Sequence, residues 1–297
     1  MNKILIFLSA LLCGAVLCTG CDQDKLDDTS VIIDSFLPQN EFDEWLADNY
    51  LNKYNINFQY RFKFVESDMD YHLTPAEYAQ SIMMARLTQH LILEAYDEVT
   101  GSTEFIRNYF PKFVHLIGSP AYNENNSVTL GVAEGGKKMT LYEVNSLRSR
   151  FENQDLITLN ERYFKTMHHE FGHILHQTKP YTSDFNAITA AAYVGDACFQ
   201  TYGSDKSARQ DGFVTRYSSK SPDEDFVENL SLYVTVTAEE WEAILEQGGQ
   251  TGRLLIQQKI DIVRRYMTDT WNIDIDQLRK EVLRRQNEIW TLDFNIN

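Results

Sequence analysis

The stretch His169-Glu170-Phe171-Gly172-His173 decides the expected fold, because it matches the pattern H-E-x-x-H. Apolar residues flank it at helical spacing and predict a largely buried helix that begins near Asn160; they are Tyr163, Phe164, Met167, Ile174 and Leu175. Side chains four residues apart project from one helical face, so His169 and His173 can share one zinc ion. Glu170 is angled toward a metal-bound water, whose proton it can accept as a general base.

A catalytic zinc site needs a third protein ligand and an open position for water. His176 lies seven residues after His169 on the same face, but an unbroken helix carries it about 10 Å along the axis. Because that is too far to share the ion, we expect His176 to support a ligand or to face the substrate. A third histidine in the pattern H-E-x-x-H-x-x-G-x-x-H is excluded, because its position is held by Lys179.

Two glutamates, Glu224 and Glu228, lie four residues apart and therefore on one face of a predicted helix. Zincins of the glutamate class bind the metal with the first carboxylate of such a pair and hold a ligating histidine with the second. We therefore predict that Glu224 is the third ligand and that Glu228 forms a hydrogen bond with one of the two ligating histidines. Glu228, Asp196 and His176 remain alternative ligands. Ser221 and Glu224 also fit a helix-capping box, which would explain Glu224 without any metal.

The rest of the chain predicts an α+β fold. Thr74-Pro75-Ala76-Glu77 is typical of a capping box that opens a helix reaching about Tyr96. Strands are expected at residues 57–64, 112–117, 128–133 and 139–144, the last two joined by a hairpin turn. Residues 184–213 are expected to be irregular and to lie around the site. Helices are expected at residues 222–234, 238–247, 253–267 and 275–288. The expectation is thus a zincin-like domain with a small mixed sheet, an H-E-x-x-H helix and a helical C-terminal half.

The N-terminus predicts export and a lipid anchor. Residues 4–17 form an apolar run after Lys3, about the length of a signal peptide's core and too short to span a membrane stably. Small residues precede Cys21 as in the lipobox of bacterial lipoproteins, although Cys18 stands where leucine is usual. We expect a lipoprotein signal at residues 1–20, lipid on Cys21, an acidic tether over 21–38 and the catalytic domain over 39–297. The alternative is an ordinary secretory signal cleaved nearby.

Charge and cysteine content exclude several classes of function. The net charge of the 297-residue chain is −16, which repels nucleic acid and anionic lipid headgroups alike. Any membrane attachment therefore needs the lipid. Cys13 and Cys18 would leave with the signal and Cys21 would be modified, so that Cys198 is left without a disulfide partner. Its apolar surroundings predict a buried, inert thiol.

Three motifs together resemble one family, the zinc metallopeptidase lipoproteins associated with substrate import. They are residues 169–177, residues 224–228, and the segment 131–145 with its turn Ala133-Glu134-Gly135-Gly136-Lys137. The resemblance covers the chain from about Phe42 to its end. It implies Zn²⁺ as the cofactor, an outer-membrane location exposed at the cell surface, and a neighbouring TonB-dependent transporter as a partner.

The same two helices also resemble the zinc domain of anthrax lethal factor. There the first glutamate of the second helix is a ligand, and a tyrosine seven residues before it assists catalysis. The matching position here is Tyr217. The resemblance therefore implies that Tyr217 donates a hydrogen bond to the oxyanion of the reaction.

These features favour a zinc peptidase that hydrolyses extracellular peptides or glycoproteins. The hairpin strands at residues 128–133 and 139–144 are the candidates for holding an extended substrate. One alternative is a zinc amidase acting on a non-peptide conjugate. The other is a non-catalytic accessory lipoprotein with a zinc-stabilised binding surface, against which Glu170 argues because a structural site needs no general base.

Overall fold

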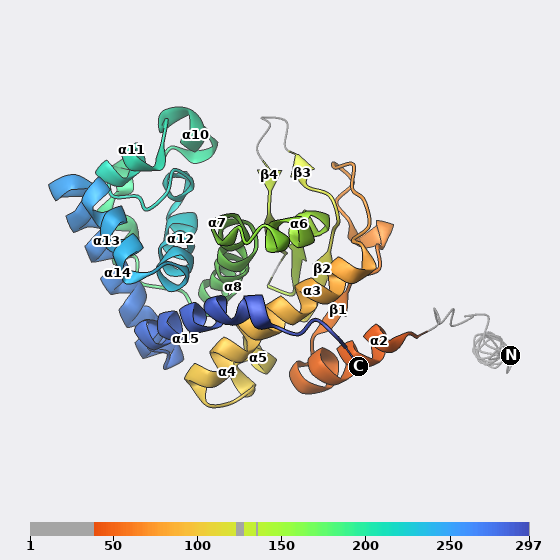
Figure 1. Ribbon diagram of the computed structural model, residues 1–297. Helices are drawn as coiled ribbons and strands as arrows, with labels where there is room; N and C mark the ends of the chain where they lie inside the picture. Colours follow the sequence, from red (N-terminus) through yellow and green to blue (C-terminus); the bar gives the residue numbers. More distant parts are fainter. Residues whose placement is uncertain (1–38, 123–127, 135, 297) are drawn as a thin grey trace, which may run out of the picture. The chain divides into compact units, whose positions relative to one another are not determined.

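The computed structural model describes residues 39–122, 128–134 and 136–296 (Figure 1). The predicted signal peptide, the lipidation site Cys21 and the acidic tether lie outside these residues. Within the part that is described, no helix is both long and apolar enough to cross a membrane.

A four-stranded mixed sheet forms one part of the domain, in the order β1-β2-β6-β5. The strands β1 (Asn57–Gln59), β2 (Phe113–Leu116) and β6 (Lys138–Leu141) run parallel, and β5 (Gly131–Glu134) pairs antiparallel with β6 at the edge. A separate antiparallel pair joins β3 (Ala121–Tyr122) to β4 (Val128–Thr129). The expected small mixed sheet is confirmed, and β5 pairs with β6 as in the expected hairpin. The first strand is much shorter than residues 57–64, the strand expected at 128–133 is divided between β4 and β5, and the strand expected at 139–144 ends at Leu141.

Helices make up most of the remaining chain. In the N-terminal half they are α2 (Glu41–Leu46), α3 (Tyr78–Thr88), α4 (Glu94–Thr100), α5 (Glu104–Tyr109), α6 (Leu147–Glu152), α7 (Leu156–Leu159) and α8 (Lys165–Thr178). In the C-terminal half they are α9 (Asp184–Ile188), α10 (Cys198–Thr201), α11 (Asp205–Gln210), α12 (Pro222–Thr235), α13 (Ala238–Gln247), α14 (Gly249–Trp271) and α15 (Ile275–Glu288). The segment 184–213, expected to be irregular, thus contains three short helices.

The helix predicted to open at Thr74 begins four residues later, so the capping-box prediction there is wrong. The carbonyl of Thr74 accepts a hydrogen bond from the backbone N–H of Gly118, and Pro75 forms a β-bridge with Ile117. This pairing keeps the segment extended. The helix starts only at Tyr78, after Glu77, whose N–H donates to the side chain of Asn145.

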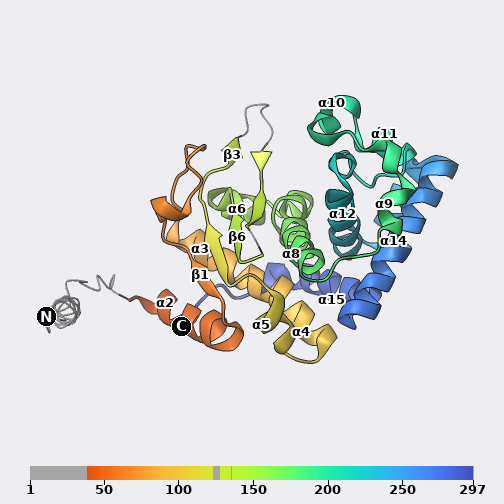
Figure 2. The ribbon, with the colours of Figure 1, turned by 180° about the vertical axis from the view of Figure 1, so that it is seen from behind.

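The helix α8 lies between the sheet and α12 (Figures 1 and 2). It continues α7 through a π-helical turn, Asn160–Phe164, and its inner face is buried. Gly131 on β5 lets the sheet approach α8 closely from one side, and Gly172 on α8 lets α12 approach it closely from the other. A Cβ at Gly131 would stand 2.6 Å from the Thr166 side chain, and one at Gly172 would stand 3.0 Å from Val227. Small residues at these two positions therefore bring both neighbours against α8.

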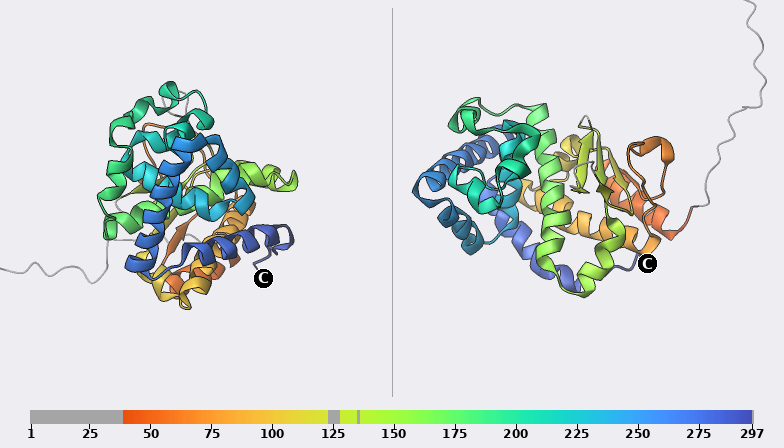
Figure 3. Two further views of the ribbon diagram at one scale, coloured as in Figure 1. Left: turned by 90° about the vertical axis from the view of Figure 1, so that its left-hand side faces the viewer. Right: turned by 90° about the horizontal axis from the view of Figure 1, so that it is seen from above.

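The helices α13 and α14 pack beyond α12, and the whole C-terminal half is helical, as expected (Figure 3). A fully buried ion pair holds this part together: the Nζ of Lys259 on α14 lies 2.5 Å from the Asp225 carboxylate on α12. The same ammonium donates to the carbonyl of Gly212, and the hydroxyl of Tyr193 donates to Asp225. Four separate parts of the chain are thereby fixed beside the start of α12.

Candidate metal centre

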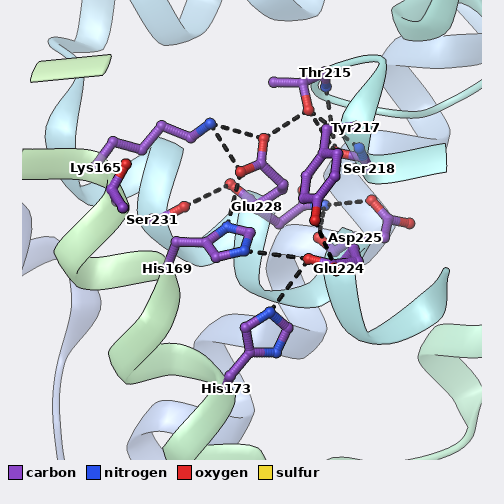
Figure 4. Close-up of polar contacts among 12 residues, drawn as sticks. Lys165, His169, His173, Thr215, Tyr217, Ser218, Glu224, Asp225, Glu228 and Ser231 are labelled. Atoms are coloured by element: carbon purple, nitrogen blue, oxygen red, sulfur yellow. Dashed lines mark hydrogen bonds and ion pairs between the residues drawn. The ribbon is translucent and has the colours of Figure 1, made fainter. Parts of the chain in front are cut away.

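Three side chains from two helices converge on one point (Figure 4). The Nε2 atoms of His169 and His173 each lie 3.2 Å from Oε2 of Glu224. Among the described residues these three form the one group of His, Cys, Asp or Glu side chains whose ligand atoms gather in this way, all within 4.8 Å of one another. The structure therefore brings together the three residues predicted as metal ligands.

The start of α12 explains how Glu224 reaches the histidines. Ser221 is the N-cap, its Oγ accepts a hydrogen bond from the Glu224 backbone N–H, and Pro222 occupies the first turn. The Glu224 carboxylate does not return to the cap; it turns toward His169 and His173. Burial favours its neutral form, but the histidine hydrogen bonds outweigh burial and hold its pKa far below the ordinary value. Capping thus accounts for the backbone of Glu224 and leaves its carboxylate for the site.

Glu228, one turn further along α12, supports His169 from behind. Its carboxylate lies 2.9 Å from Nδ1 of His169 and 2.8 Å from Nζ of Lys165, and it accepts a 2.6 Å hydrogen bond from Thr215. Burial is outweighed by the charge of Lys165 and the hydrogen bond of His169, so the pKa of Glu228 is well below its usual range. An ionised Glu228 accepts the hydrogen bond of the Nδ1–H of His169, so Nε2 is the nitrogen that would hold a metal ion at the centre.

His176 plays the same part for His173. Its Nε2 lies 3.0 Å from Nδ1 of His173, so it contacts a candidate ligand without joining the group. Burial lowers the pKa of His176 to about 4, which favours the neutral ring whose Nε2 can accept a hydrogen bond from the Nδ1–H of His173. The fourth candidate, Asp196, does not join the group: its side chain is 96% exposed and approaches Lys220 instead.

Glu170 lines the sheet side of the centre. Its side chain is almost fully buried, and the backbone N–H of Ala133 on β5 donates to its carboxylate. Burial raises the pKa of Glu170 above its ordinary value, against the opposing effect of His169 and His173. A carboxylate held in this way is suited to accepting a proton.

Tyr217 and Lys220 occupy the opposite side, in the 3₁₀ turn Tyr217–Lys220 that precedes α12. The Tyr217 hydroxyl donates a 2.9 Å hydrogen bond to Oε1 of Glu224, the oxygen that faces away from the histidines. Burial, followed by the charge of Glu224, raises the pKa of Tyr217 and keeps the phenol protonated as a donor. The Nζ of Lys220 lies 3.4 Å from the same hydroxyl.

The sequence interpretation missed three of these neighbours. Lys165 stands four residues before His169 on the same helix, so helical spacing could have pointed to it. Lys220 lies in the turn before α12, where that spacing does not apply. Thr215 carried no signal, because a loop brings it to Glu228. Cys198 is buried and free, as predicted, and burial raises the pKa of its thiol.

The donor set fits a zinc ion. Two imidazole nitrogens and one carboxylate oxygen are typical of a catalytic zinc site, which leaves further positions open. The surroundings also favour positive charge at this point. Burial alone would lower the pKa of His169, but the hydrogen bonds to the Glu224 and Glu228 carboxylates stabilise the charged ring and raise its pKa to about 10. A cation bound between the three side chains would receive the same stabilisation.

Comparisons with known proteins identify the family of this chain. Residues 36–276 match the model of a family described as "Putative zinc-binding metallo-peptidase", which confirms the family expected from the motifs. A crystal structure of a putative zinc-binding metallo-peptidase from Bacteroides caccae ATCC 43185 is 42% identical in sequence, with a TM-score of 0.74. The likeness covers 86% of this chain and 96% of that one. Among curated proteins, none matches this chain.

Proposed function

Because this chain belongs to that family of zinc-binding metallo-peptidases, we propose that it is a zinc-dependent peptidase. The observation that carries the proposal is the convergence of His169, His173 and Glu224 on one point, with Glu170 buried beside them. The first three would bind the zinc ion. When bound, the ion would polarise the scissile carbonyl and lower the pKa of a water to about 7.

The protein's own residues perform the remaining steps. Glu170 accepts a proton from the attacking water and transfers it to the leaving amine. Tyr217 donates a hydrogen bond from its hydroxyl to the oxyanion that forms at the carbonyl, once that hydroxyl turns from Glu224. Glu228 and His176 hold the rings of His169 and His173 in the orientation that binding requires.

The edge strand β5 is the proposed binding strand for an extended peptide. The backbone N–H of Tyr142 donates to the carbonyl of Leu130. Because hydrogen-bonded pairs alternate along an antiparallel ladder, Val132 and Glu134 are the residues of β5 that exchange backbone hydrogen bonds with β6. The backbone groups of Gly131 and Ala133 therefore face the open edge, beside Glu170. Strand β6, the other candidate, is interior and has both edges paired with β2 and β5, so it cannot accept a further strand.

The test is hydrolysis of an unbiased peptide library by zinc-loaded protein. Glu170→Gln should keep fold and zinc but lose hydrolysis by roughly 10²- to 10⁴-fold, because glutamine cannot accept the proton. Glu161→Gln, on the turn before α8, is the matched control and should cleave as the wild type does. If the zinc-loaded wild type cleaves nothing, or Glu170→Gln cleaves equally well, the peptidase proposal is wrong.

We also propose the finer expectations from the sequence: substrates that are extracellular peptides or glycoproteins, a lipid anchor on Cys21, and a neighbouring TonB-dependent transporter. The supports are the lipobox-like sequence before Cys21 and the family resemblance. Mass spectrometry of the mature N-terminus in its native cell, and co-purification of the native protein, test these points. A mature chain that begins elsewhere without lipid would refute the anchor.

A further inference from the structure

Lys220 is a loosely held cation at the edge of the candidate centre. Its Nζ lies 3.4 Å from the Tyr217 hydroxyl, 3.6 Å from Oε1 of Glu224 and 3.8 Å from Asp196. An ammonium group has three hydrogen-bond donors, and all three of these contacts are longer than an ordinary charged hydrogen bond of about 2.7–2.9 Å. The ammonium therefore has room for a better acceptor.

The other two lysines near α12 differ clearly. The Nζ of Lys165 lies 2.8 Å from Glu228, and that of Lys259 lies 2.5 Å from Asp225. Their side chains are 18% and 0% exposed, whereas that of Lys220 is 34% exposed. Lys165 and Lys259 are committed to internal carboxylates, and Lys220 is the most exposed of the three and the one without a close carboxylate partner.

The charge balance of the cleft favours an anionic ligand at Lys220. The two charges of a bound divalent cation would offset Glu170 and Glu224, and Lys165 pairs with Glu228, so that Lys220 leaves a local excess of positive charge. Asp196 reduces it little, because a carboxylate that is 96% exposed is screened by water. The chain's net charge of −16 acts mainly over distances at which salt screens it, beyond about 8–10 Å.

We infer that Lys220 is a specificity-determining residue that binds a carboxylate of the substrate within about one residue of the scissile bond. The inference rests on the proposed peptidase function and names its substrate class: peptides with a negative charge next to the cleaved bond. The nearness of Lys220 to Tyr217 supports this distance, because Tyr217 would contact the reacting carbonyl itself. The carboxylate can be the C-terminus of the peptide or an acidic side chain.

The test measures binding in the zinc-loaded Glu170→Gln background, where no peptide is consumed. The probes are the library peptides cleaved fastest by wild type, each made in matched forms. In the first pair, the anionic form has a free C-terminus and the neutral form has an amidated one. In the second pair, both peptides are amidated, and the anionic form carries Glu beside the cleaved bond where the neutral form carries Gln. Calorimetry should show about tenfold tighter binding of the anionic form in one pair, as expected for one charge-assisted contact at a partly exposed site. The pair that shows it identifies the source of the carboxylate.

Substitution of Lys220 then assigns the preference to this residue. Lys220→Met should abolish the preference and Lys220→Arg should keep most of it, while Lys206→Met, at an exposed lysine on α11, should change nothing. Thermal unfolding and zinc content of each variant verify that fold and metal are intact.

Three outcomes would overturn the inference. Wild-type Lys220 protein that binds the anionic and neutral forms equally refutes it. A Lys220→Met variant that keeps the preference for the anionic form refutes it. A Lys220→Met variant that weakens the binding of both peptide forms by the same factor also refutes it, because Lys220 would then only neutralise Glu224. Each of these leaves the proposed function standing if the wild type cleaves peptides, whereas a wild type that cleaves no library peptide overturns both.

Discussion

At the scale of single residues, the site depends on the distinct tasks of the two oxygens of Glu224. Oε2 faces both histidines, and Oε1 accepts the hydrogen bond of Tyr217. The phenol is therefore held next to the centre by a candidate ligand. The proposed catalytic task of Tyr217 can therefore be tested separately from metal binding.

Tyr217→Phe should lower kcat by on the order of 10- to 1000-fold, as expected when one oxyanion donor is removed. KM and zinc content should change little, because the ring remains and the three ligands are untouched. Steady-state kinetics with zinc analysis measure both effects. A variant that loses zinc in proportion to its activity would show that Tyr217 acts by holding Glu224.

The chemistry-bearing residues were largely predictable, because helical spacing relates positions within one helix. The i, i+4 pairs His169 with His173 and Glu224 with Glu228 each needed only a correct helix assignment. Lys220 and Thr215 were missed because their roles depend on where a turn and a loop lie against α12, and local spacing alone does not specify such a placement.

At the scale of elements, the contact between β5 and α8 fixes the position of the proposed general base. Gly131 lies directly over α8: a Cβ there would stand 2.6 Å from Thr166 and 3.3 Å from Cγ of Glu170. The strand can approach this closely only without a side chain at that position. The Ala133 N–H then reaches the Glu170 carboxylate.

Gly131→Ala should therefore push β5 away from α8 and lower kcat/KM on the order of 10- to 100-fold, because small displacements of positioned groups are costly. Zinc content should be unchanged, since no candidate ligand touches Gly131. Gly203→Ala is the control, because nothing lies within 4 Å of a Cβ at that position. Equal activity of the two variants would show that the close approach has no catalytic part.

Element boundaries were less predictable than element types. Most helices of the C-terminal half were placed correctly because each carries a largely apolar face, but the one expected at residues 253–267 extends from Gly249 to Trp271. The start of α3 was misplaced because Pro75 and Thr74 pair with residues more than forty positions away, at Ile117 and Gly118. Long-range pairing of this kind overrides a local capping signal.

At the scale of the whole domain, the candidate centre joins two parts that differ in architecture. The helix α8 packs on the sheet and supplies two of the three candidate ligands, and α12 belongs to the helical C-terminal half and supplies the third. The α+β class followed from the order of predicted elements. The strand order β1-β2-β6-β5 did not, because parallel pairing brings together residues distant in sequence, such as Asn57 and Phe113.

The most direct test of the account is the zinc content of purified full-length protein, measured by elemental analysis and by competition with a chelator of known affinity. We predict that the wild type binds one zinc ion per chain and that Glu224→Ala loses it. Glu228→Gln should retain zinc with roughly 10- to 100-fold weaker affinity, because glutamine keeps the side-chain shape but supports His169 less strongly. A Glu224→Ala protein with full zinc, or a Glu228→Gln protein with none, would contradict the assignment of His169, His173 and Glu224 as the metal ligands.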